Sequence, residues 1–242
     1  MAYRQSTINK ANSSAAPSTA VPTGVATNDI ILLLGSFDQQ TATWSGQWPT
    51  GFTHLDEVAL TLDGQKVGIS WKRASGADTG SYTCAGTPGS GVAADWALIA
   101  LAFSGRDTGN PPVKSTVASN NSSNASPVTA TANAVTAVAG DDLAWLCGPD
   151  RNSGTSTTVF TAPTGHTLRQ SGDQGFTTVA AATVDNVSAG STGTVAGSYT
   201  LSASQSGWGV WLVRVPAASV AATATPPPVI AWQAAVQRAA SW

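Results

Sequence analysis

The chain has 242 residues, of which only 10% are charged, and its formal net charge at neutral pH is −2. This composition offers no basic stripe, so it argues against a protein that binds nucleic acid through its phosphates. Ala, Ser, Thr, Val and Gly dominate while Lys, Glu and Leu are scarce, which favours strands and tight turns over helices.

The chain shows no membrane segment and no export signal. No run reaches the ~18 apolar residues expected of a spanning helix, and residues 1–6 contain no apolar signal-peptide core. Yet the charge-poor, Thr-, Ser- and Gly-rich composition is typical of extracellular proteins. A protein that is made in the cytoplasm and works outside the cell would fit a virion component, so we expect a virion location and no membrane partner.

Residues 1–22 are polar, show no periodicity and end near Pro22. We expect an extended N-terminal arm without a core of its own, ordered by contacts with neighbouring subunits. Tyr3 is the candidate for such an assembly contact.

A β body is predicted over residues 23–216, with a first half at 23–105. Its opening strand, 30–34, and its closing strand, 95–105, are short apolar runs, as expected of strands buried on both faces. Pro49 and Gly51 indicate a turn between them. Further strands are expected at 52–55, 67–72 and 81–85, and residues 106–135 form a long connection.

The second half, 136–216, repeats the order of the first. A Pro-Thr-Gly turn recurs at an offset of 114, a Gly-Ser-Tyr-Thr motif at 117 and the Trp of the closing strand at 112. Three motifs in one order at nearly one offset predict an internal duplication, although Thr- and Gly-rich β proteins also produce such matches by chance.

The expected fold is therefore all-β: a jelly-roll-like antiparallel β-sandwich built from two sequence-related halves, with extended N- and C-terminal arms. We expect the halves to interleave, each giving strands to both sheets, because one shared core buries more surface than two thin modules. Two small tandem domains are the alternative.

Residues 217–242 form a Pro-rich linker and a C-terminal tail. Three consecutive prolines at 226–228 make a stiff spacer. The large apolar side chains beyond it predict assembly contacts with a sister subunit or another partner; the alternative is that the tail folds back over its own sandwich. These candidate contact residues are Ile230, Trp232, Val236 and Trp242.

No catalytic or metal motif emerges, so the protein is expected to be no enzyme and to need no cofactor. Adjacent Asp56 and Glu57 should point to opposite faces of a strand, and Asp141 and Asp142 should cap a turn. Neither pair suits a glycosidase. Loop carboxylates at Asp38, Asp78 and Asp95 lack calcium-loop spacing. Cys84 and Cys147 are expected to be buried free thiols, with a disulfide as the alternative, and both histidines, His54 and His166, to be surface or satisfied loop residues.

Trp44 and Trp48 lie in a polar loop, where exposed indole rings could stack on sugar rings. With Asp38 to bond hydroxyls, they form a candidate glycan contact. The alternative is that both rings cover the end of the sandwich or contact a sister subunit.

Several motifs together resemble a module of tailed-phage virion proteins and related prophage genes, commonly labelled minor tail or virion structural proteins, with a lectin-like sandwich. The likeness covers roughly residues 20–216 and is carried by structural motifs, so no site residue is transferred. It implies a non-enzymatic particle protein, in a homotrimer with other virion proteins as partners, on the capsid or the tail, with contact to host surface glycans as an extension. The alternatives are a stand-alone carbohydrate-binding module and, less favoured, a polysaccharide depolymerase. The resemblance rests on segments 25–32, 48–53, 71–74, 80–83 and 103–105.

Overall fold

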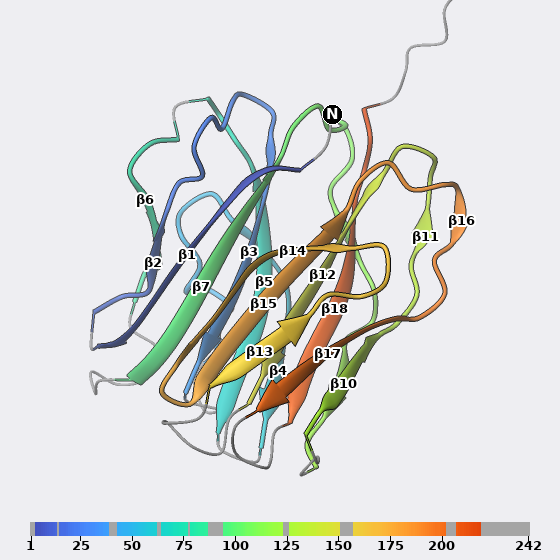
Figure 1. Cartoon of the computed structure of the whole chain (residues 1–242). Coiled ribbons are helices and arrows are strands. Elements are labelled where there is room, and N and C mark those ends of the chain that lie inside the picture. Colours follow the sequence, from blue (N-terminus) through green and yellow to red (C-terminus); the bar gives the residue numbers. More distant parts are fainter. Residues whose placement is uncertain are drawn as a thin grey trace, which may run out of the picture.

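The computed structural model describes residues 3–13, 15–38, 43–61, 64–76, 78–86, 94–122, 126–150, 157–201 and 207–218 (Figure 1). Throughout these residues the regular structure is β, all named strand pairs are antiparallel, and no helix occurs. The predicted all-β, antiparallel fold class is confirmed. Within the same residues, no helix is long and apolar enough to cross a membrane.

The first large sheet is built from the N-terminal half of the chain. Its order is β1-β7-β3-β5-β4. The opening and closing strands, β3 and β7, are buried along their whole length and lie side by side within the sheet, as their apolar runs predict. The bounds are β1 Tyr3–Ser13, β3 Ile30–Phe37, β4 Thr53–Leu60, β5 Gln65–Arg73 and β7 Ala94–Phe103.

The second large sheet is built from the second half, with β8 and β9 added from the connection between the halves. Its order is β14-β15-β12-β18-β8, and β9 also pairs with β18. Here too the opening and closing strands, β12 and β18, are buried neighbours. The bounds are β8 Val113–Lys114, β9 Ala118–Asn120, β12 Asp142–Pro149, β14 Thr167–Gln174, β15 Thr177–Val184 and β18 Trp208–Val215.

Three small sheets complete the described structure. One pairs β2 (Ser18–Ala20) with β6 (Ser81–Thr83) beside the first large sheet. Another has the order β10-β17-β13 and lies over the second large sheet; a third pairs β11 with β16. The bounds of these last strands are β10 Val128–Ala132, β11 Thr136–Ala137, β13 Thr158–Thr161, β16 Gly190–Ser191 and β17 Val195–Leu201.

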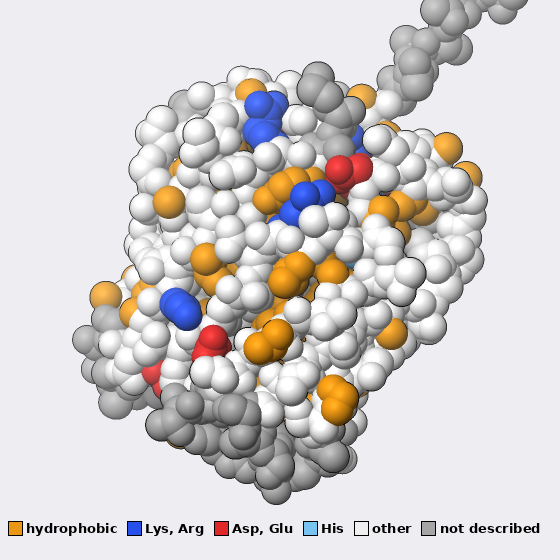
Figure 2. Space-filling model, in the orientation of Figure 1, with side chains coloured by type: hydrophobic (Ala, Val, Ile, Leu, Met, Phe, Trp, Pro, Cys, Tyr) orange, Lys and Arg blue, Asp and Glu red, His pale blue; other side chains and the backbone are white. Residues whose placement is uncertain are grey.

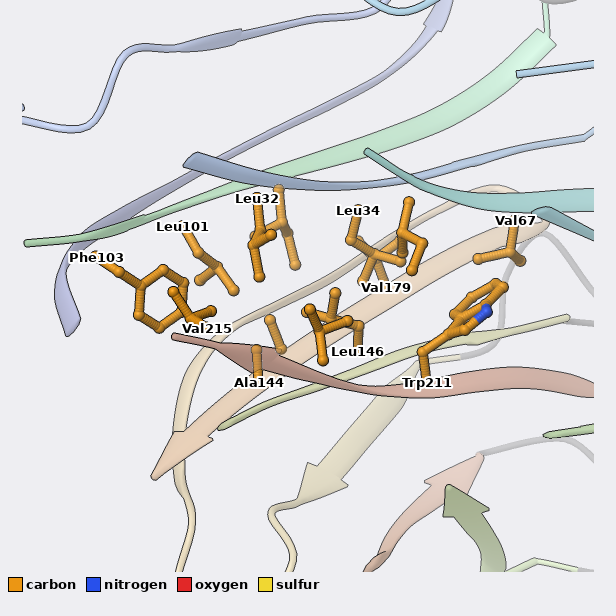
Figure 3. Packing of buried hydrophobic residues seen from close by; sticks show 14 of the residues in the cluster. Leu32, Leu34, Val67, Leu101, Phe103, Ala144, Leu146, Val179, Trp211 and Val215 are labelled. Carbon is orange, nitrogen blue, oxygen red and sulfur yellow. The ribbon is translucent and has the colours of Figure 1, made fainter. Parts of the chain in front are cut away.

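Apolar side chains fill three clusters. The central cluster lies between the two large sheets, where Leu32 and Leu34 of β3 face Leu146 of β12 and Trp211 of β18 (Figure 3). A second cluster lies between the second large sheet and the β10-β17-β13 sheet, and a third between the first large sheet, β6 and the loop that carries Trp44. Because strands β3, β7, β12 and β18 have apolar side chains on both faces, they contribute to two clusters each.

The two large sheets share one strand order, one register and one bulge. The order β7-β3-β5-β4 of the first large sheet matches the order β18-β12-β15-β14 of the second. In this match the paired residues Ile30 and Phe103 correspond to the paired residues Asp142 and Val215, at an offset of 112. The bulge between His54 and Asp56 recurs after Leu168, at the offset of 114 that the Pro-Thr-Gly turns also show. This correspondence is what a duplication would produce; the duplication itself stays an inference.

The turn that precedes each half's opening strand is reproduced in the same way. Asp29 accepts a hydrogen bond from the backbone N–H of Ala26 (2.9 Å), and Asp141 accepts one from Val138 (2.7 Å). Each carboxylate also pairs with an arginine, at 3.0 Å for Asp29 and 3.3 Å for Asp141. The prediction that Asp141 caps a turn is confirmed.

Two expectations about the architecture are wrong. The halves do not interleave, because no described strand of residues 23–105 lies in the second large sheet and none of residues 136–216 lies in the first. The two sheets meet face to face. Nor are residues 1–22 an arm outside the body: residues 3–13 form β1, hydrogen-bonded along β7, and residues 18–20 form β2. Strand β1 was missed because its polar edge-strand sequence offers little apolar alternation.

Tyr3, expected to contact a neighbouring subunit, packs against its own chain. Its ring meets Phe103 edge-on at 6.2 Å, and the Arg169 guanidinium lies 4.0 Å from its centroid. Its hydroxyl is 2.7 Å from that of Ser6. The other four predicted assembly residues, Ile230, Trp232, Val236 and Trp242, lie outside the described residues.

Candidate functional site

The two tryptophans of the predicted glycan contact are core residues. Trp44 is 1% exposed and Trp48 6%, and their rings stack at 4.3 Å. Trp44 fits where Gly35 and Gly68 face each other across β3 and β5; a Cβ on either glycine would lie 2.5 Å from its ring. The expectation that these rings are exposed to a sugar is wrong. The alternative, that both rings cover the end of the sandwich, agrees with their packing in the third apolar cluster.

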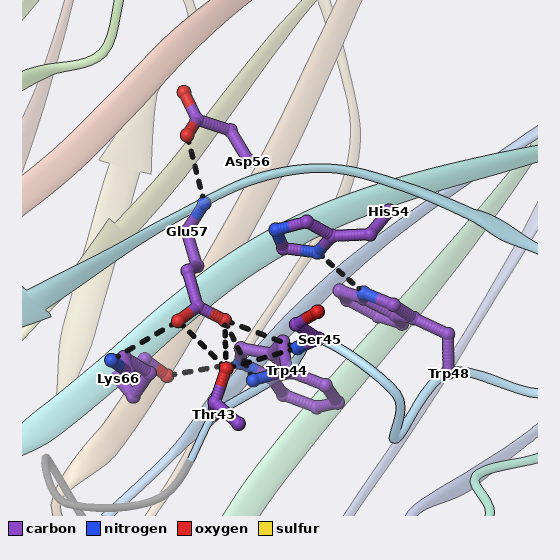
Figure 4. Close-up of polar contacts among 8 residues, drawn as sticks. All are labelled: Thr43, Trp44, Ser45, Trp48, His54, Asp56, Glu57 and Lys66. Atoms are coloured by element: carbon purple, nitrogen blue, oxygen red, sulfur yellow. Dashed lines mark hydrogen bonds and ion pairs between the residues drawn. The ribbon is translucent and has the colours of Figure 1, made fainter.

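Polar groups beside these rings hold the loop in place (Figure 4). The Glu57 carboxylate accepts hydrogen bonds from the Thr43 hydroxyl and the Trp44 backbone N–H, and pairs with Lys66 at 3.2 Å. Burial alone would raise the pKa of Glu57, but these partners outweigh burial and lower it. The Trp48 indole N–H donates to Nδ1 of His54 at 2.9 Å, so His54 has a hydrogen-bond partner, although it lies in β4 and not in a loop as expected.

The neighbouring carboxylates are occupied by structural contacts. Asp56 points away from Glu57, as predicted, and accepts hydrogen bonds from Lys114 (2.7 Å) and the Trp211 indole (3.0 Å). Although burial would raise the pKa of Asp56, these bonds lower it. Asp56 therefore ties β4 of one large sheet to β8 and β18 of the other.

The remaining candidate carboxylates do not converge either. Asp142 is buried against Arg106 at 3.1 Å, and burial raises its pKa to about 6. Asp78 pairs with Lys72 at 2.6 Å. Asp95 accepts from Phe176 N–H, while the backbone N–H of Asp38 donates to the Asp95 carbonyl. Among the described residues, no group of three or more His, Cys, Asp or Glu side chains could hold a metal ion.

Cys84 and Cys147 are free and buried, as predicted. Burial raises the pKa of the Cys84 thiol to about 12 and that of Cys147 well above its ordinary value. Because the thiolate is the reactive form, neither residue is suited to nucleophilic chemistry.

The feature that sequence reasoning missed is a groove in the second half, which we call the His166 groove. Its volume is about 470 Å³. His166 is half-buried; its Nδ1 lies 3.4 Å from the Thr164 carbonyl oxygen, and its Nε2 is buried with no hydrogen-bond partner. Burial lowers the pKa of His166, which favours the neutral ring. No charged residue lines the groove, which is formed by Leu143, Pro163, Thr164, Gly165, His166, Val184, Val187, Ser188, Gly190, Ser191, Thr192, Thr194, Val195 and Ala196.

The corresponding groove in the first half has a volume of about 320 Å³ and a charged lining. Phe52, the counterpart of His166 at the offset of 114, packs edge-on against Tyr82 at 5.0 Å. Lys72 lies over both rings, 5.5 Å from Phe52 and 5.4 Å from Tyr82, and pairs with Asp78. Lys72 corresponds to Val184 at an offset of 112, and Asp78 corresponds to Val195 at an offset of 117. Two valines of the His166 groove therefore stand where the first half has this ion pair. The His166 groove therefore has neither the Phe52–Tyr82 ring pair nor the two charges beside it.

Comparisons with family models, with curated proteins and with solved structures found no match.

Proposed function

We propose that this protein is a non-enzymatic structural subunit of a tailed-phage particle, which assembles with sister copies, as a homotrimer, through its C-terminal segment. The observation that carries the proposal is the segment itself. It places Ile230, Trp232, Val236 and Trp242 beyond three consecutive prolines, and residues 219–237 contain no charge. Large apolar groups on such a spacer are suited to burial against another subunit.

The chemistry of the body supports a structural role. Four of the candidate carboxylates are each held in an ion pair: Asp56, Glu57, Asp141 and Asp142. The viewed face in Figure 2 carries few charged side chains and several exposed hydrophobic ones. Exposed Val159, Leu168 and Phe176 are among the large apolar residues available for contact.

The test is the mass of the full chain against a chain that ends at Ala218, measured by light scattering after size-exclusion chromatography. A trimer that becomes a monomer on truncation is expected. A full chain that stays monomeric at about 100 µM would overturn the assembly role. Labelling phage particles with an antibody to this chain, followed by electron microscopy, tests the particle assignment and separates capsid from tail.

A stand-alone carbohydrate-binding module is the second candidate function. The observation that favours it is the His166 groove, which is uncharged and lined by the hydroxyls of five Ser and Thr residues. Titration with neutral monosaccharides, followed by NMR shifts of the His166 ring, distinguishes it from the structural role.

A further inference from the structure

The small sheets of the two halves differ by one strand. In the first half β6 pairs with β2, whereas in the second half β17 pairs with β10 on one edge and with β13 on the other (Figure 1). Both β6 and β17 carry the repeated Gly-Ser-Tyr-Thr motif, so Tyr82 corresponds to Tyr199 at an offset of 117. Among the described residues, β6 therefore lacks a neighbour that its counterpart has.

The missing neighbour belongs on the edge of β6 that turns away from β2. The backbone groups of Gly80 and Cys84, on either side of β6, hydrogen-bond to the residues that flank β2. Successive residues of a strand present their backbone groups to opposite edges, so Ser81 and Thr83 present theirs to the other edge. Both residues are exposed, and each offers one N–H and one C=O for a further strand.

Strand β17 shows that this edge accepts a short strand. Ser198 and Thr200 stand where the first half has the two exposed residues of β6, and they pair with Thr161 and Val159 of β13. That pairing needs only the four residues of β13, Thr158–Thr161. The short length of β6 is therefore no obstacle to the addition of a strand.

The groove of the first half follows the free edge of β6. Its volume is about 320 Å³, and its lining includes Ser81, Tyr82 and Thr83. The lining of the His166 groove reaches Ala196 but not residues 198–200, which are the residues that pair with β13. The first-half groove thus extends along the backbone that a strand covers in the second half.

We propose that the free edge of β6 binds an extended strand of another particle protein, which adds to the β2-β6 sheet as β13 adds to β17. In this binding mode, main-chain hydrogen bonds supply affinity and alternate side chains supply specificity. Since β13 is itself fixed on β17, a sister copy has no such strand to lend. The inference takes its partner from the proposed particle role but goes beyond self-assembly through the C-terminal segment.

The side chains around the first-half groove indicate which strand fits. Lys72 and Asp78 pair with each other at 2.6 Å and are mostly buried, so they need no charged partner from a ligand. An uncharged strand of Thr, Ser and Val residues therefore suits the groove, and β13, Thr-Val-Phe-Thr, has nearly this composition. The rim is formed by four exposed hydroxyl side chains: Thr50, Thr79, Ser81 and Thr83.

The middle residue of the added strand is expected to be small. In the second half, Phe160 of β13 lies 5.7 Å from the ring of Tyr199. In the first half, Phe52 already packs against Tyr82 at 5.0 Å. Alanine in place of the phenylalanine avoids a third ring, which gives a probe peptide with the sequence Thr-Thr-Val-Ala-Thr-Ala.

The experiment titrates this peptide, with both ends blocked, into the isotope-labelled full chain and follows the backbone amide signals by NMR. We expect saturable shifts at Ser81 and Thr83, with a Kd of about 1 mM or tighter. N-methylation of the valine or of the threonine that follows it removes an N–H that faces β6, and should weaken binding about tenfold or more. N-methylation of the central alanine, whose N–H points away, is the matched control and should change binding less than about threefold.

Proline substitutions test the same edge from the side of the protein. Proline is tolerated in an edge strand where its missing N–H has no partner. Thr83→Pro should therefore abolish peptide binding but shift the midpoint of thermal unfolding by less than about 3 °C. Its counterpart Thr200→Pro removes an N–H that faces β13 and should lower the midpoint by about 5 °C or more.

Several results would overturn the inference. No saturable shift at Ser81 and Thr83 up to about 5 mM peptide would do so, as would equal losses of stability in Thr83→Pro and Thr200→Pro, which mean that the edge is already paired. Peptide binding that appears only when copies dissociate on dilution would assign the edge to a second copy instead of another protein. If truncation after Ala218 abolishes assembly but the peptide does not bind, the proposed function stands and this inference falls.

Discussion

The two halves of this protein share a strand order and register but differ in the side chains that line the groove beside their Pro-Thr-Gly turns. The offsets of 112 and 114 hold across strand pairs, bulges and turn hydrogen bonds. Within that framework, Lys72 and Asp78 give the first groove a charged lining, while His166 and two valines give the second one an uncharged lining. The same backbone frame therefore presents two grooves of different chemistry.

The largest expected effect on stability comes from Trp44, whose ring is buried in the core of the first half. Trp44→Ala should lower the free energy of unfolding by about 3–5 kcal/mol, because the ring is 1% exposed and lies on two glycines that cannot fill the space. Urea denaturation followed by circular dichroism measures it. A loss below about 1 kcal/mol would mean that the loop packs loosely.

The second half carries a buried acid where the first has Ile30. Burial raises the pKa of Asp142 to about 6, above its ordinary value of 3.8. Folding therefore favours the protonated form, so this contribution to stability is present below pH 4 and is lost as the pH rises through 6. On the order of 1–3 kcal/mol should be lost across that range, and Asp142→Asn should flatten the profile. A wild-type curve that rises between pH 4 and 6 and is unaltered in Asp142→Asn would contradict this.

Exchanging the groove residues sharpens the comparison. Phe52→His should cost about 2 kcal/mol, because it removes the contact with Tyr82 and buries a polar ring beneath Lys72. His166→Phe should stabilise the chain by about 1 kcal/mol, because it removes an unpaired buried Nε2 and adds apolar contact. Both follow from thermal or urea unfolding of the two variants. Equal changes of one sign would show that the grooves do not differ as described.

The smallest effect is expected at the ion pair of the first groove. Lys72→Met removes a contact with Asp78 that is mostly buried, but it keeps the aliphatic packing over Phe52. We expect a loss of about 1 kcal/mol that shrinks with added salt, measured against Val184→Met as the matched change in the second half. A loss that is insensitive to salt would point to packing instead of charge.

The sequence predicted the class of fold and the central strands, because apolar runs buried on both faces are local signals. It did not predict that the two large sheets pack face to face, because the burial of a strand does not identify the sheet that covers it. The burial of Trp44 had a readable signal: Gly35 and Gly68 interrupt two strands, and strand glycines often mark a close approach. Polar neighbours in the loop pointed the other way.

Part of the His166 groove could be predicted from the sequence. The aligned Pro-Thr-Gly turns already place His166 opposite Phe52. The uncharged lining of the groove could not be predicted, because it depends on Val184 and Val195, which come from different strands and stand where the first half has an ion pair known only from the structure.

The most direct measurement is an experimental structure of the assembled full-length chain, by electron microscopy or crystallography. We expect the large apolar side chains of the C-terminal segment, Trp232 and Trp242 among them, to be buried against a neighbouring copy. An assembly held together by other surfaces, with both indoles exposed to solvent, would contradict this expectation.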